Sequence, residues 1–117
     1  VKAKAAELYN SVNWLKHKGL LNQDLKVPNL DSINLNEIKA SIDELININN
    51  IVAGKLNELA SKLNVPLSII RYIASMGPNV GLDEVIMARE LGMESREVIN
   101  YLEALWRAKL VEKRYVS

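Results

Sequence analysis

The stretch ARELGMESREVINYLEALWRAKLVEKR, residues 88–114, decides the fold of the C-terminal half of this chain. Its apolar residues recur at helical spacing on both sides of Gly92, and glycine turns a chain at low steric cost. The stretch therefore predicts a helix that ends at Gly92, a second helix that begins near Ser95, and a short basic segment that could form a strand. Ala88 would let the two helices approach closely, and Met93 would fill the corner between them.

The second predicted helix has an apolar side and a polar side. Val98, Leu102 and Leu105 fall on one stripe, with Ile99 and Trp106 beside it, and we expect this stripe to face the core. The opposite side would then face solvent. It carries the polar residues Ser95, Arg96, Asn100, Glu103 and Arg107.

This arrangement resembles the helix-turn-helix of the winged-helix superfamily, over about the last fifty residues of the chain. The resemblance implies a first helix at 67–76, a second at 82–91, a recognition helix at 95–108 and the start of a wing at 110–117. A recognition helix places its N-terminal half in the major groove of DNA. The resemblance therefore implies a DNA-binding unit.

The same resemblance implies which side chains would contact DNA. Arg96 would bind guanine and Asn100 adenine, each through paired hydrogen bonds, and Ser95 at the helix start would contact a phosphate. Further basic contacts would come from Arg107, Lys113 and Arg114.

The charge of this region is balanced. Residues 64–117 contain seven Lys and Arg and seven Asp and Glu, and Glu94 and Glu97 lie on or beside the face of Arg96. The net charge of the whole chain is +1. Because the neutralisation of phosphates is the main source of non-specific affinity, we expect weak DNA binding that falls steeply with salt.

The N-terminal segment 2–21 predicts a helix that stops near Gly19. Its charged residues are Lys2, Lys4, Glu7, Lys16, His17 and Lys18, interleaved with the aromatic residues Tyr9 and Trp14. Basic and aromatic side chains in this mixture suit a single-stranded nucleic acid, whose phosphates and bases they bind. The alternative is that Trp14 anchors the core and the lysines are only solvated. Arg71 would extend the basic patch or pair with neighbouring acids.

The middle of the chain has a heptad pattern that follows a predicted capping box of Asn34 and Glu37. Apolar or small residues occupy a and d positions 35, 38, 42, 45, 52, 56, 59 and 63, and Asn49 occupies one a position. One interpretation is a homodimer through residues 35–63, a coiled coil whose buried Asn49 fixes the register. The other is one or two amphipathic helices inside a bundle. Weak helix formers favour a break between Asn49 and Gly54.

Two pairs of segments are similar within the chain. ELASKLNVPLSIIRYI, residues 58–73, resembles VIMARELGMESREVINYL, residues 85–102. VNWLKHKGLL, residues 12–21, resembles LEALWRAKLV, residues 102–111. These similarities predict repeated helix–turn elements.

The chain lacks the residues that several classes of function require. The chain has no Cys, so it can form neither a disulfide nor a thiolate metal site, and His17 alone cannot build a His-rich metal site. Neither a catalytic grouping nor a glycine-rich phosphate loop nor metal-ligand spacing occurs. No stretch approaches the ~20 apolar residues of a membrane span. We therefore expect a cytoplasmic, non-catalytic protein without a cofactor.

These patterns together predict an all-α protein, a helical bundle with an N-terminal subdomain at 1–63 and a winged-helix-like helix-turn-helix subdomain at 64–117. The expected partner is DNA, single- or double-stranded. Two settings fit: a small transcription regulator, or a template-binding domain of a larger DNA-replication enzyme, similar in size and architecture to the helix-bundle accessory domain of archaeal and plasmid primases. The alternative function is a winged helix that binds another protein through Trp106 and its mixed-charge last helix, without DNA.

Overall fold

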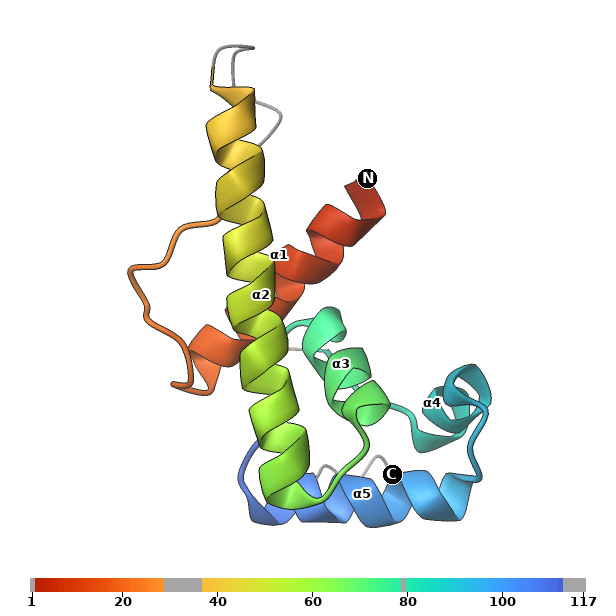
Figure 1. Ribbon diagram of the computed structural model, residues 1–117. Coiled ribbons are helices and arrows are strands. Elements are labelled where there is room, and N and C mark those ends of the chain that lie inside the picture. Colours follow the sequence, from red (N-terminus) through yellow and green to blue (C-terminus); the bar gives the residue numbers. More distant parts are fainter. Residues whose placement is uncertain (1, 29–36, 79, 113–117) are drawn as a thin grey trace.

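The computed structural model describes residues 2–28, 37–78 and 80–112, with side chains from Ala6 onward, and these residues form an all-α fold (Figure 1). The helices of the described part are α1 (Lys2–His17), α2 (Ile38–Leu63), α3 (Leu67–Met76), α4 (Glu84–Leu91) and α5 (Ser95–Arg107). The predicted fold class is thus confirmed at the level of an all-helical protein.

The wing expected at 110–117 is not formed where the chain is described. Leu110 and Val111 lie in a bend after α5, and no strand occurs between residues 2 and 112 in the described ranges. Leu110 is buried, with its side chain in the core. Lys113 and Arg114 lie outside the described residues.

In Figure 1 α3, α4 and α5 lie around the lower half of α2, α1 passes it near the middle, and the first turns of α2 extend above the N-terminal end of α1. α1 and α3 pack against each other and against α2, α4 packs on α5, and α5 runs across the end of the molecule opposite the tip of α2 (Figure 1). The molecule is elongated, with extents of 51 × 25 × 24 Å. This elongation follows from the length of α2.

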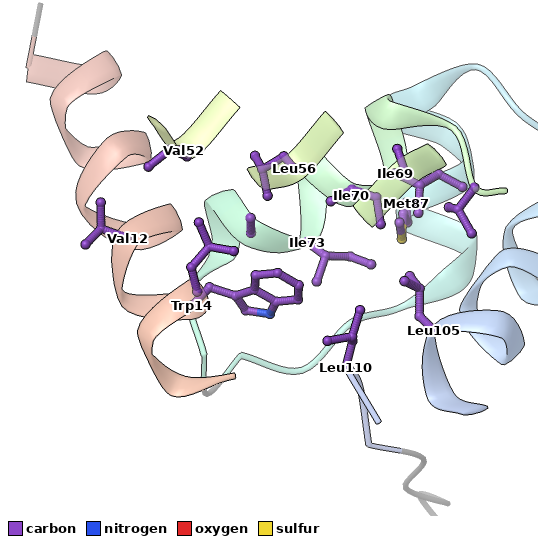
Figure 2. Close-up of a cluster of buried hydrophobic side chains, with 14 of the residues drawn as sticks. Val12, Trp14, Val52, Leu56, Ile69, Ile70, Ile73, Met87, Leu105 and Leu110 are labelled. Carbon is purple, nitrogen blue, oxygen red and sulfur yellow. The ribbon is translucent and has the colours of Figure 1, made fainter. Parts of the chain in front are cut away.

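One continuous core joins the two predicted subdomains. Figure 2 shows Val12 and Trp14 of α1 at one end of this core and Met87 and Leu105 of α4 and α5 at the other, with Ile73 of α3 between them. Burying one aliphatic side chain of this size stabilises a fold by about 1.5–3 kcal/mol. The remaining fully or nearly buried apolar residues are Leu15, Ile48, Val52, Leu56, Ala60, Val65, Ile69, Ile70, Ala74, Ala88, Val98 and Leu110.

α2 is one continuous helix, so the predicted break between Asn49 and Gly54 is wrong. Weak helix formers cost at most about 1 kcal/mol each. Against this cost, Ile48, Val52 and Leu56 are buried at four-residue spacing on one side of the helix, and each burial is worth more than one unfavourable residue. Tertiary packing therefore overrides local propensity. The helix begins at Ile38, and the predicted cap at Asn34 lies outside the described residues.

Four helices end in the same way. After α1, α2, α4 and α5 a residue with positive φ is followed by an apolar residue whose amide donates to a carbonyl five residues earlier, the Schellman arrangement. The positive-φ residues are Gly19, Asn64, Gly92 and Lys109. The bonds are Leu20 to Leu15 (2.9 Å), Val65 to Ala60 (3.0 Å), Met93 to Ala88 (2.9 Å) and Leu110 to Leu105 (2.9 Å). These four ends coincide with the segments that are similar in sequence.

Candidate nucleic-acid interface

The link between α4 and α5 has the geometry that the sequence predicts. α4 ends at Leu91, Gly92 adopts φ +66°, and α5 begins at Ser95. At the other end of α4 the Asp83 carboxylate accepts hydrogen bonds from the amides of Val85 (2.8 Å) and Ile86 (3.3 Å), which caps the helix. The turn at Gly92 and the cap at Asp83 together fix the short α4 and so the direction in which α5 leaves it.

α5 buries its predicted apolar stripe and exposes its polar side. Val98 is 0% and Leu105 is 1% exposed, and Leu102 is partly buried against the core. Arg96 and Asn100, about 160° around the helix from Val98, are exposed. Neither side chain is walled in by the protein, so both are accessible to a ligand.

Charges alternate along this polar side of α5. Arg107 forms an ion pair with Glu103 at 3.9 Å, four residues earlier, and the side chains of Arg107 and Glu103 are 74% and 44% exposed. An exposed pair of this kind contributes only about 0.3–0.5 kcal/mol to stability. Ser95 is half-buried at the helix start, while Glu94 and Glu97 are exposed within one turn of Arg96. Acids at a helix N-terminus complement its dipole, and they also repel phosphate there.

Two large apolar side chains lie on one edge of α5. Ile99 is 41% and Trp106 is 46% exposed, although both flank the stripe that faces the core. They are seven residues apart, and seven residues are two helical turns, so they share the same edge. An open hollow beside Trp106 is lined further by Lys109, Val111 and Glu112. This edge is apolar where the neighbouring face is charged.

The basic residues of α1 hold their own chain together. The Trp14 indole is 2% exposed and packs in the core near Leu110 (Figure 2), so it is not available to stack on a base. The Lys18 ammonium lies over this ring at 6.0 Å from its centroid. The Lys16 ammonium donates to the carbonyl oxygen of Leu25 in the loop after α1. The burial of Trp14 therefore fits the alternative in which this residue anchors the core.

The loop after α1 is fixed by further side-chain bonds. The Tyr9 hydroxyl donates to the Pro28 carbonyl at 2.7 Å, and the Gln23 amide donates to the Lys16 carbonyl at 2.5 Å. The Asp24 amide donates to the Asn22 side chain at 2.9 Å. Lys16 is therefore one of several groups that hold residues 18–28 against α1. His17 is exposed, and the side chains of Lys2 and Lys4 lie outside the description.

The predicted basic residues do not gather around α5. In Figure 1 the C-terminal end of α1, where Lys16 lies in the last turn and Lys18 directly follows it, and the first turn of α5, which carries Arg96, lie on opposite sides of α3. Arg71 is exposed on α3. The α1 lysines and the N-terminal half of α5 thus form two separate regions.

Tyr72 of α3 and Glu90 of α4 form a contact that the sequence did not indicate. Partial burial, a hydrogen bond with the Glu90 carboxylate, and the negative charges of Glu90 and Asp83 all raise the pKa of the Tyr72 hydroxyl above its ordinary value. The contact joins α3 to α4, which otherwise packs mainly on α5. Its role is to orient the short helix that precedes the Gly92 turn.

In the described ranges, no group of three or more His, Asp and Glu side chains is arranged to hold a metal ion. None of the helices in those ranges combines the length and the apolar character that crossing a membrane requires. Comparisons with family models, with curated proteins and with solved structures gave no match to this chain.

Proposed function

We propose that this protein is a non-catalytic DNA-binding module in which α4, the Gly92 turn and α5 act as a helix-turn-helix. The observation that carries the proposal is the exposure of Arg96 and Asn100 on the first half of α5, opposite the buried Val98. Arginine and asparagine are the residues that bind guanine and adenine through paired hydrogen bonds in the major groove. Ser95, at the start of the same helix, would contact a phosphate.

The proposal favours double-stranded over single-stranded DNA. A single-stranded site needs aromatic rings on which bases stack, but Trp14 is 2% exposed, and Tyr9 is half-buried with its hydroxyl bonded to Pro28. A protein that recognises double-stranded DNA needs only a protruding helix with base-contacting side chains near its start. The balanced charge around α5 makes the affinity low, which suits a module that works within a larger DNA-replication protein or as a small regulator.

Fluorescence anisotropy with labelled duplexes tests the proposal. Duplexes selected from a randomised pool by the wild type would be titrated at low and moderate salt, with the corresponding single strands alongside. Arg96→Ala and Asn100→Ala should each lose about 1–3 kcal/mol of preference for the selected base. Arg89→Ala, which removes the same charge from an exposed position on α4, is the matched control and should keep the preference.

The same titrations also test the contribution of Lys16 and Lys18. If these lysines contact phosphate, Lys16→Ala/Lys18→Ala should lower the affinity for duplexes of every sequence alike and reduce the salt dependence of that affinity. An unchanged salt dependence would assign them to the internal bonds with Leu25 and Trp14 alone. No duplex binding at low salt would overturn the DNA-binding proposal.

One observation favours a second function, the binding of another protein. Ile99 and Trp106 expose 41% and 46% of their surface on one edge of α5. Tryptophan is strongly enriched among the residues that dominate protein–protein affinity. In this case Ile99→Asp would abolish binding of the partner, whereas Arg96→Ala would have a small effect.

A further inference from the structure

The N-terminal half of α2 carries an apolar stripe that the described part of the chain leaves partly exposed. Ile38, Ile42 and Ile46 are 37%, 44% and 55% exposed, and Leu45 beside them is only half-buried. The three isoleucines are four residues apart, so they lie on one side of the helix over about 12 Å. This N-terminal half of α2 is remote from α4 and α5 and reaches beyond the end of α1 in Figure 1, so it is called the projecting half.

The stripe continues the core-facing side of α2 beyond the end of the core, because Ile38 and Ile42 lie five helical turns before the buried Leu56 and Ala60. Burial of α2 in the core begins at Ile48 and continues through Val52, Leu56 and Ala60. Val52 and Leu56 are heptad positions that would face a partner helix in a coiled coil over 35–63. Both are instead buried in the core of their own chain. Asn49, the polar heptad position, is exposed and ends the apolar stripe. Any pairing of helices is therefore confined to the projecting half.

From this arrangement we infer that the projecting half of α2 pairs with the same segment of a second copy, in antiparallel orientation, with Ile42 against Ile42 at the centre. In this pairing Ile38 of each copy meets Ile46 of the other. The three isoleucines of each chain then cover one another.

The charges beside the stripe select the antiparallel orientation. Lys39 and Asp43 lie on the same edge, at about 60° and 100° around the helix axis from Ile42. Over the described part of the chain neither of them takes part in an ion pair. In an antiparallel pair like edges meet, and Lys39 of one copy comes within about 3 Å, measured along the axis, of Asp43 of the other. The two-fold symmetry repeats this pair.

A parallel pair lacks these contacts. There the Lys39 edge of one copy meets the other edge of the second copy, which carries Ser41 and Leu45 and no acid. The stripe itself is also short, so the interface falls well below the ~1,200 Å² of stable complexes. We therefore expect a weak dimer that forms with increasing concentration.

Sedimentation velocity over a wide concentration range tests the pairing. Ile42→Glu should weaken self-association at least about tenfold. Ile51→Glu is the matched control, because Ile51 is 37% exposed on the same helix but lies about 180° from Ile42. Circular dichroism would verify that both variants keep the helical fold. A wild type that stays monomeric at every concentration, or equal effects of both substitutions, would overturn the inference.

Cross-linking tests the orientation, since the chain has no Cys of its own. Ile42→Cys should form a disulfide-linked dimer alone, whereas Ile38→Cys and Ile46→Cys should form one efficiently only when mixed. A parallel pair would cross-link each variant by itself. Lys39→Glu and Asp43→Lys should each weaken the dimer, and the double variant should restore it. These measurements use no DNA, so their outcome is independent of the proposed function.

Discussion

The carboxamide of Asn10, in the middle of α1, donates a hydrogen bond to the backbone carbonyl of Ser75 across 3.0 Å. Ser75 lies in the last turn of α3, where the carbonyl oxygens of a helix have no partner within the helix. The bond therefore satisfies a group that would otherwise need water, and it fixes the end of α3 against α1. The Gly77 turn that follows passes close to the same side chain, with the Asn10 oxygen 3.8 Å from the place of an added Cβ.

Removing this bond should lower the free energy of unfolding. Asn10→Ala should destabilise the protein by about 1 kcal/mol, because the Ser75 carbonyl loses its donor in a partly buried position. Urea denaturation followed by circular dichroism measures the change. Asn13→Ala, at an exposed position of the same helix, should change stability by less than about 0.5 kcal/mol. Equal effects of the two substitutions would contradict this role.

Replacing glycine by alanine should change the free energy of unfolding in opposite directions at two positions. Gly92→Ala places a Cβ on a residue with φ +66° and should cost about 1 kcal/mol, whereas Gly54→Ala lies within α2 and should stabilise by about 0.5–1 kcal/mol. An added Cβ meets no neighbouring atom at either position, so the backbone conformation alone sets the sign. Urea midpoints of both variants measure it, and a stabilising Gly92→Ala would contradict the left-handed turn.

The end of α5 carries a lysine where helices usually have glycine. Lys109 adopts φ +63°, and its neighbour Leu110 closes the Schellman bond to Leu105. Lys109→Gly should therefore stabilise the protein by about 1 kcal/mol, since glycine adopts this conformation without steric cost. Thermal unfolding measures the gain. Ala108→Gly, at φ −81°, gives the comparison and should bring no gain.

The Tyr72–Glu90 contact predicts a dependence of stability on alkaline pH. The pKa of Tyr72 is higher in the folded than in the unfolded chain, so the protonated hydroxyl stabilises the fold. This contribution is fully present below the unfolded pKa, near pH 10, and is lost as the pH rises through the raised folded pKa. Unfolding free energies of wild type and Tyr72→Phe, measured across this range, should converge as the pH increases.

Glu90→Gln separates the causes of this shift. Removing the carboxylate charge should lower the pKa of Tyr72 only in part, because burial is the largest cause and remains. A ¹³C-labelled tyrosine titration by NMR resolves Tyr72 from the other tyrosines. A Tyr72 pKa unchanged by this substitution would contradict the contact.

Local turn chemistry explains which parts of the fold were predictable. Pro66, Gly77 and Gly92 mark helix boundaries directly in the sequence, and α3 has the predicted bounds Leu67–Met76. α5 begins at the predicted Ser95 and ends at Arg107, one residue before the predicted end. Its exposed face was predictable as well, because amphipathic spacing determines which side of a helix is buried.

The parts that failed depend on contacts between distant segments. The continuity of α2 through Asn49 and Gly54 depends on a core that α3 completes. No local sequence pattern predicts this continuity. The role of Lys16 and Lys18 in nucleic-acid binding stays a prediction, but their contacts with Leu25 and Trp14 of their own chain could not be read from a local pattern. The raised pKa of Tyr72 likewise needs Glu90 from another helix. Such pairings become visible only once the helices are placed.

The length of α2 separates its tip from α5. At 1.5 Å per residue its 26 residues make a rod of about 39 Å, anchored in the core at one end only. The free tip and α5 lie at opposite ends of the molecule (Figure 1). A molecule bound at the tip would therefore leave α5 at the far end accessible.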